Sequence, residues 1–255
     1  MLLLISPAKS LFTENENIPI ESKPYFTEES SQIVDLMKDY KVNDLMDLMK
    51  ISVALASVNQ IRFQDMFLKK RKVRKQAVYL FDGDVYDGLQ IRSFQEDELK
   101  SLGERLIILS GLYGILRPFD MIYPHRLEMG TSVKVGDFQN LHQFWRPRLS
   151  VYLNRIQKKD KSKYLINLAS NEYFQSIDTQ MYQGKIIHIH FREEVKGVLK
   201  QISFFAKKAR GIMAAYLIKN KILDPIGIQN FQEEGYRFDP SISNEDNYYF
   251  IRKSI

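Results

Sequence analysis

Residues 1–10 read MLLLISPAKS, an apolar run over residues 1–5 followed by a polar loop that contains Pro7 and Lys9. An apolar run of this length, bounded by a turn signal, predicts a buried strand. No basic residue precedes the run, and it is shorter than the apolar part of a secretory signal, which also favours a strand. The same order, an apolar run followed by a loop of small or charged residues, recurs along the chain.

Four more apolar runs lead into such loops, at residues 77–81, 106–109, 164–168 and 202–205. Residues 184–191 and 247–252 also have the composition of strands, and helical patterns separate several of the runs. This arrangement predicts an α/β (or α+β) fold with a mixed β-sheet flanked by helices. The 255 residues contain no internal repeat and no low-complexity linker, so we expect a single domain over residues 1–255.

The composition restricts the kinds of partner. The chain has 0 Cys, which excludes disulfides and thiolate metal sites. No segment approaches the ~18 apolar residues of a membrane span, so we expect no membrane partner and a cytoplasmic location. Lysine and arginine number 37 against 31 aspartates and glutamates, which gives a net charge of +6 and favours an anionic partner such as nucleic acid.

Cationic side chains gather at or just after the predicted strand ends. They are Lys9, Arg117, Arg126, Lys207, Lys208 and Arg210. If the strand ends converge, these side chains form a cationic cleft that binds phosphate, helped by the helix N-termini that face it. The alternative is that each cation pairs locally, for instance Arg126 with Glu128 or Glu172.

The densest positive charge lies at residues 69–75, with six cations in seven residues. Four of them are Lys69, Lys70, Arg71 and Lys72. Because no aromatic residue interrupts the run, an arm of this kind would contact backbone phosphates and not bases. A solvated connector is the alternative interpretation.

Two other patterns raise the question of a metal. Residues 81–88 (FDGDVYDG) place Asp82, Asp84 and Asp87 around two glycines, and oxygen ligands suit Mg²⁺ or Ca²⁺. The calcium-loop pattern is missing, so we favour an acidic turn between two elements. His188 and His190 alternate on a predicted strand, but two histidines exposed on a strand face are commoner than a metal site. We therefore predict no metal and no cofactor.

Long motifs extend from the first strand to the last forty residues: ISPAKS (5–10), FDGDVYDGL (81–89), LSGLYGILRPFD (109–120), PHRLEMG (124–130), QFW (143–145), NLASNEYF (167–174), SFFAKKARG (203–211) and GYRFD (235–239). Together they resemble the YaaA family of peroxide-stress proteins over almost the full length. The resemblance implies an unusual single-domain α/β fold with a basic cleft that binds DNA, and survival of hydrogen peroxide through limited free intracellular iron.

The resemblance also implies a helix-hairpin-helix element, for which residues 51–67 are the candidate, with Ser57 and Val58 at its turn. From these points we expect a protein that binds double-stranded DNA without sequence specificity. The alternative is an enzyme acting on a nucleotide or nucleic acid, with a site formed by Lys9, Asp84, Arg117, Glu172 and Lys207. Because the common glycine-rich and nucleophile motifs are absent, the sequence favours a binding protein over an enzyme.

Overall fold

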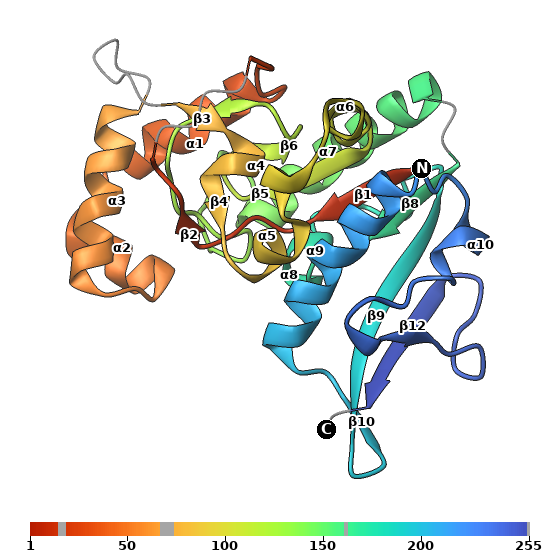
Figure 1. The fold of residues 1–255 in the computed structure, drawn as a ribbon. Helices are drawn as coiled ribbons and strands as arrows, with labels where there is room; N and C mark the ends of the chain where they lie inside the picture. Colours follow the sequence, from red (N-terminus) through yellow and green to blue (C-terminus); the bar gives the residue numbers. More distant parts are fainter. Residues whose placement is uncertain (15–18, 67–73, 161–162, 254–255) are drawn as a thin grey trace.

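A mixed β-sheet of eight strands forms the centre of the protein (Figure 1). The computed structural model describes residues 1–14, 19–66, 74–160 and 163–253. The strand order is β11-β12-β9-β8-β1-β5-β6, and β10 pairs with β9. The strands are β1 (Leu2–Ile5), β5 (Leu106–Ser110), β6 (Gly114–Leu116), β8 (Tyr164–Asn167), β9 (Lys185–Val195), β10 (Val198–Lys200), β11 (Arg237–Phe238) and β12 (Asn247–Lys253).

The direction of the strands decides where the functional loops meet. β1, β5, β8, β9 and β12 are parallel, whereas β6, β10 and β11 run antiparallel to their neighbours. All four residues of β1 are buried, as expected for a central strand that is covered on both faces. β9 alternates buried and partly exposed residues, so only one of its faces belongs to the core. The predicted mixed sheet is therefore confirmed.

Helices and short strand pairs surround this sheet. α9 (Ser203–Lys219) crosses in front of β1 and lies beside β9 in the view of Figure 1, and it contacts both strands. The other helices are α1 (Thr27–Lys38), α2 (Val42–Met49), α3 (Val53–Asp65), α4 (Ala77–Leu80), α5 (Asp84–Leu89), α6 (Glu96–Arg105), α7 (Leu141–Asp160), α8 (Asn171–Phe174) and α10 (Pro225–Ile228), with 3-10 turns at Ile91–Ser93 and Glu233–Gly235. The small pairs are β2 (Ser10–Leu11) with β4 (Phe81–Asp82), and β3 (Lys75–Gln76) with β7 (Met121–Ile122). Across the described ranges, none of the helices combines the length and the apolar character that crossing a membrane requires.

Two glycines bring α5 and α9 into backbone contact. A Cβ atom on Gly88 would lie 2.1 Å from the carbonyl oxygen of Lys208, and one on Gly211 would lie 1.8 Å from the carbonyl oxygen of Val85. Neither distance is possible for a real side chain, so any other residue would push the two helices apart. This contact positions the first turn of α5 beside the two successive lysines of α9.

Two of the predicted strands are wrong. Residues 77–80 form the short helix α4, and only Phe81–Asp82 are extended, as β4. Residues 203–205 are the first turn of α9, whose apolar positions continue at helical spacing to Leu217. Both runs are short, and a short apolar run fits a buried strand and a buried helical turn equally well.

The helix-hairpin-helix element expected over residues 51–67 is not found there. Ser57 and Val58 lie in the middle of α3, which runs without interruption from Val53 to Asp65. The turn lies earlier, between α2 and α3, where Lys50 adopts a left-handed conformation and Ser52 accepts a hydrogen bond from the Leu55 amide. The expected turn was misplaced because Ser and Val are tolerated within a helix.

Candidate functional site

The loops that follow three neighbouring parallel strands meet at one edge of the sheet, which we call the carboxyl edge. These loops follow β1, β5 and β8, as expected for parallel strands. Ser6 and Ser170 tie two of the loops together, because the Ser170 amide donates to the Ser6 hydroxyl oxygen at 2.9 Å. The Tyr86 hydroxyl of α5 donates to the Ser6 carbonyl at 3.2 Å and so fixes α5 against the same edge.

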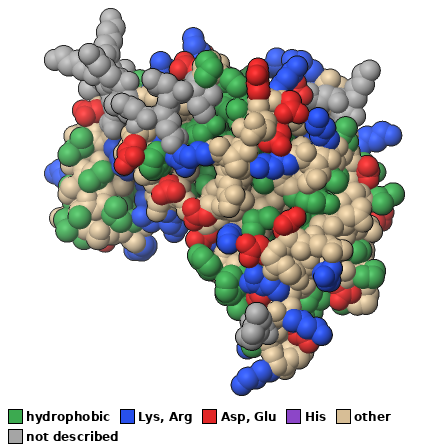
Figure 2. Space-filling view, viewed as in Figure 1, with side chains coloured by type: hydrophobic (Ala, Val, Ile, Leu, Met, Phe, Trp, Pro, Cys, Tyr) green, Lys and Arg blue, Asp and Glu red, His purple; other side chains and the backbone are tan. Residues whose placement is uncertain are grey.

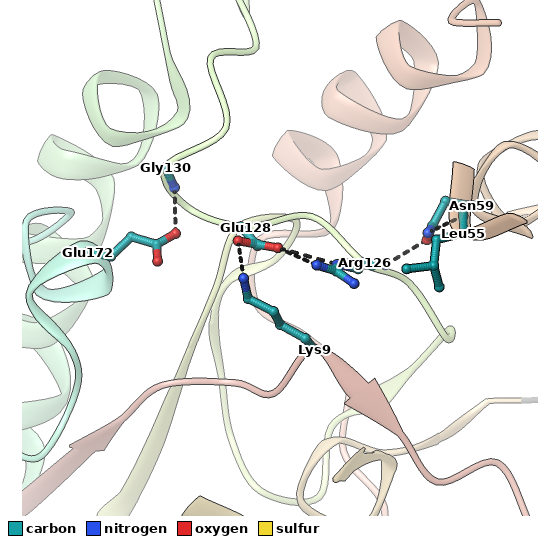
Figure 3. Close-up of polar contacts among 7 residues, drawn as sticks. All are labelled: Lys9, Leu55, Asn59, Arg126, Glu128, Gly130 and Glu172. Atoms are coloured by element: carbon teal, nitrogen blue, oxygen red, sulfur yellow. Dashed lines mark hydrogen bonds and ion pairs between the residues drawn. The ribbon is translucent and has the colours of Figure 1, made fainter. Parts of the chain in front are cut away.

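Glu128 joins two of the predicted cations at this edge (Figure 3). The ammonium of Lys9 lies 2.8 Å from Glu128 Oε2, and the guanidinium Nη2 of Arg126 lies 3.0 Å from Oε1. Partial burial acts to raise the pKa of Glu128, but hydrogen bonds and charge from Lys9 and Arg126 outweigh it and lower that pKa. The carboxylate therefore stays ionised between its two cations.

α3 holds the Arg126 loop from the other side. The Arg126 amide donates to Asn59 Oδ1 at 3.1 Å, and Asn59 Nδ2 donates to the Leu55 carbonyl at 2.8 Å (Figure 3). Asn59 is fully buried, so this hydrogen bond anchors the loop to the helix. No motif in the sequence singles out Asn59, because a lone asparagine within a helical pattern carries no spacing signal.

Glu172 has a structural role in the same neighbourhood. Its Oε1 accepts a hydrogen bond from the Gly130 amide at 3.1 Å (Figure 3). His142 Nε2 lies 2.6 Å from the Glu172 carbonyl oxygen. The next residue, Tyr173, is buried, and burial followed by the charges of Glu172 and Glu128 raises its pKa, so its hydroxyl stays protonated.

Lys207 reaches the carboxyl edge from α9. Its ammonium lies 3.8 Å from Asp84 Oδ2, in the first turn of α5. The loop of Lys9 is adjacent, because Ser10 pairs with Asp82 and a Cβ on Gly83 would lie 3.5 Å from the Ala8 Cβ. We call Lys9, Asp84, Arg126, Glu128 and Lys207 the edge cluster.

Lys208 and Arg210 follow Lys207, but neither pairs with a carboxylate of the edge cluster in the described part of the chain. Lys208 forms an ion pair with Glu234 at 3.0 Å. The Nε of Arg210 is buried without a hydrogen-bond partner in the described part of the chain. Burial, followed by the nearby charge of Arg192 on β9, lowers the pKa of Arg210.

Arg117 does not belong to the carboxyl edge, contrary to the prediction. Its Nη2 donates to the carbonyls of Gly103 and Glu104, both at 2.6 Å, near the end of α6. The reason is that residues 114–116 form a return strand, β6, which pairs antiparallel with β5 and sets Leu116 opposite Ile108. The chain therefore carries Arg117 back toward the start of β5.

The basic run at residues 69–75 falls mostly outside the described residues. Lys69, Lys70, Arg71 and Lys72 all lie in that undescribed part. Lys75 is buried, and its ammonium donates to the carbonyls of Phe12 at 3.2 Å and Glu14 at 2.8 Å. This last lysine of the run therefore stabilises the fold.

The aspartates of residues 82–87 and the two histidines have separate surroundings. Asp84 faces Lys207, whereas Asp82 and Asp87 line a pocket on another side of α5. His188 Nδ1 lies 2.9 Å from Asn167 Nδ2, and His190 Nε2 lies 2.9 Å from Asn247 Oδ1. Within the ranges that the structure describes, no three His, Asp or Glu side chains are grouped so that they could hold a metal ion.

Comparison with known sequences identifies the family. Residues 1–242 match the sequence model of a family described as "Peroxide stress protein YaaA". The chain belongs to the YaaA peroxide-stress family. It is similar to a UPF0246 protein of Polaromonas, with 41% identity over 255 residues and 99% of each chain covered. Similar UPF0246 proteins occur in Bordetella petrii, with 40% identity and 100% of each chain covered, and in Flavobacterium johnsoniae, with 42% identity and coverage of 99% of this chain and 100% of the relative.

The edge cluster of this YaaA-family chain is built from the motifs on which the predicted resemblance rested. Lys9 lies in ISPAKS, Asp84 in FDGDVYDGL, and Lys207 in SFFAKKARG, while Arg126 and Glu128 share PHRLEMG. Segments far apart in the sequence thus supply one charged surface. Figure 2 shows cationic and acidic side chains interspersed on the face drawn, with a concave outline between the α2–α3 lobe and α9.

Proposed function

We propose that this protein acts in the cytoplasm in peroxide stress by binding DNA without sequence specificity at the carboxyl edge, and so limits iron-dependent damage. The observation that carries the proposal is the meeting of Lys9, Arg126 and Lys207 within one cluster. Three cations there face two carboxylates, Asp84 and Glu128. The cluster therefore has an excess of positive charge that suits a phosphate backbone.

Two of these cations, Lys9 and Lys207, are exposed and can exchange a carboxylate for a phosphate. The side chains of Lys9 and Lys207 are 62% and 50% exposed, and each has one ion pair in the edge cluster. Exposed ion pairs contribute little to stability, about 0–1 kcal/mol, so a phosphate can replace either carboxylate at small cost. Contacts of this kind position a duplex but carry no sequence information.

The start of α9 supports the same surface. Its first turn contains no acidic residue, and its N-cap, Ile202, provides no side-chain hydrogen bond. The first amides of a helix then remain available to an anion, and the helix dipole favours negative charge there. Lys207 follows this turn directly.

In this proposal the protein limits iron-dependent damage because it occupies the phosphates of the DNA. Ferrous iron bound to DNA phosphate reduces hydrogen peroxide to hydroxide and a hydroxyl radical next to the sugar and is itself oxidised to ferric iron, and cationic side chains on the same phosphates exclude it. In this proposal the protein acts by shielding DNA and needs no iron ligands of its own. A nicking assay tests it: the protein should reduce the cutting of plasmid DNA by ferrous iron and peroxide at protein concentrations that coat the DNA.

The matching binding experiment uses a short duplex of arbitrary sequence and fluorescence anisotropy. With three phosphate contacts, affinity should fall about 40-fold between 50 and 200 mM salt, because each contact releases condensed counterions. Lys9→Gln combined with Lys207→Gln should weaken binding and abolish protection from nicking. Lys221→Gln is the matched control, since Lys221 is also exposed and also pairs with an aspartate, Asp97, at 3.2 Å. The proposal is refuted if Lys221→Gln weakens DNA binding as much as the double variant does, or if the affinity for the duplex does not change with salt.

A second candidate function is an enzyme acting on a nucleotide or nucleic acid at the same edge. It is favoured by a narrow hollow that Lys9, Arg126 and Glu128 line together with Ser110, His125 and Tyr173. Of the residues predicted for such a site, Arg117 lies at the end of α6 instead, which leaves Lys9, Asp84, Glu172 and Lys207. Incubation with nucleotides and oligonucleotides, followed by chromatography, would detect a product that Glu128→Gln no longer forms.

A further inference from the structure

A pocket of about 460 Å³ opens beside β4 and α5. This volume is within the range of small-molecule sites, about 300 to 1,000 Å³. Phe12, Tyr79 and Phe81 contribute aromatic surface to its lining, and Asp82, Asp87 and Arg92 contribute charge. No residue of the edge cluster lines it, so the pocket has charged groups of its own.

The aromatic wall is fixed in place. Tyr79 and Phe81 are 5% and 4% exposed, so the core holds their rings. Phe81 also packs against Tyr86, with ring centroids 5.7 Å apart. A wall of this kind offers a preformed apolar surface to the body of a ligand, and little side-chain ordering is needed on binding.

The carboxylates of the pocket differ from those of the edge cluster. Asp84 and Glu128 each face at least one cation. Asp82 and Asp87 are both exposed, and neither side chain has an ion pair or hydrogen bond with a residue in the described ranges. The pocket therefore presents two negative charges that have no partner among the residues the structure describes, on a chain whose net charge is +6.

The guanidinium of Arg92, which contributes to the lining, lies on the ring of Phe12. Arg92 Cζ is 4.6 Å from the centre of that ring, and the ammonium of Lys75 is 4.2 Å from it. Cations are attracted to aromatic faces, especially where water is partly excluded. The pocket thus already accommodates positive groups against its aromatic surface, and Arg92 offsets only part of the charge of the two aspartates.

We propose that this pocket binds a small organic cation. An ammonium or amidinium group of the ligand meets Asp82 and Asp87, and its aromatic or apolar body lies against Tyr79 and Phe81. The contacts combine charge-assisted hydrogen bonds with burial of apolar surface, which is how small-molecule sites usually obtain both orientation and affinity. An anionic ligand of the same shape is repelled by the carboxylates.

Three probes with the same ring test the proposal: benzamidine, benzyl alcohol and benzoate. Calorimetry on the full chain should show benzamidine binding in the millimolar range or tighter, at least tenfold weaker binding of benzyl alcohol, and none of benzoate. Asp82→Asn combined with Asp87→Asn should weaken benzamidine binding at least tenfold. Asp35→Asn, on α1, is the control and should leave benzamidine binding unchanged. Asp35 is also an exposed aspartate, but it forms an ion pair with Lys38.

Saturating duplex DNA should not displace benzamidine, because the edge cluster does not line the pocket. The proposal is overturned if benzamidine does not bind below about 10 mM, if benzyl alcohol binds equally well, or if the double variant binds benzamidine like the unaltered chain. These results would leave the DNA proposal intact, since its variants are Lys9→Gln and Lys207→Gln.

Discussion

Glu128→Gln should strengthen DNA binding, because Glu128 competes with phosphate for Lys9 and Arg126. The Lys9 ammonium lies 2.8 Å from Glu128 Oε2. A phosphate oxygen at hydrogen-bond distance on the far side of that ammonium would lie about 5 to 6 Å from the carboxylate. Two unit charges at that separation repel by about 0.7 kcal/mol in a water-like dielectric, so removing the carboxylate should raise affinity about threefold at low salt.

The same substitution should lower stability. Arg126 is only 17% exposed, and it loses the carboxylate that holds it at 3.0 Å. Leaving a largely buried cation without its partner costs more than breaking a surface pair, so we expect a loss of about 1–3 kcal/mol. Tighter DNA binding by a less stable protein is an unusual combination, and it separates the two roles of Glu128.

Anisotropy with one duplex at 50 mM salt measures the first effect, and urea denaturation measures the second. Glu245→Gln is the control, because Glu245 also pairs with a lysine, Lys185, at 2.7 Å. This control also removes one negative charge, but at a position away from the carboxyl edge. If Glu128→Gln weakens DNA binding while the protein remains folded, Glu128 orders its cations for phosphate and the competition argument is wrong.

Three further outcomes are expected. Burial holds the pKa of His125 at about 4, below its ordinary value of about 6.5, so the unfolded chain takes up this proton first as pH falls. The contribution of neutral His125 to the free energy of unfolding is complete above about pH 6.5 and is lost as the pH approaches 4, so that stability is about 2 kcal/mol lower at pH 5. The midpoints of urea denaturation should show this fall, and His125→Gln should make them less dependent on pH. Glu193→Gln should cost about 3 kcal/mol in urea denaturation, because Glu193 is buried and pairs with Arg252 at 2.8 Å, whereas Glu194→Gln should have little effect. Arg117→Ala should lower the melting temperature through its lost bonds to two carbonyls, yet leave the affinity for DNA unchanged in anisotropy.

The strands of the sheet could be predicted wherever the apolar run was followed by a distinct loop. Residues 1–5, 106–109 and 164–168 all contain observed strands, because a central parallel strand is apolar on both faces. Residues 77–81 and 202–205 are equally apolar but mostly form helical turns or a helix start. In these runs tertiary contacts, such as the packing of α5 on α9, decide the conformation, and local sequence does not contain that information.

The candidate site could be predicted in part. The position of Lys9 follows from the rule that parallel strands end at one edge, because Lys9 comes directly after β1. The positions of Arg126 and Lys207 do not follow from this rule, since Lys207 lies in the helix α9 and Arg126 follows the short strand β7 outside the main sheet. Arg117 could not be excluded in advance, because the return strand β6 is only three residues long and leaves no clear pattern. The pairing of Arg126 with Glu128 was one of two alternatives, and the structure confirms it.

The backbone contact between α5 and α9, at Gly88 and at Gly211, also has a consequence for synthesis of the protein. α5 is six residues long, too short to be stable alone, and its partner α9 is translated about 120 residues later. At about 5–20 residues per second, a ribosome needs roughly 6 to 24 seconds to cover that interval. During this time the nascent chain lacks Lys207 and so has no complete edge cluster. A growing chain therefore cannot use the complete edge cluster to bind the messenger that encodes it.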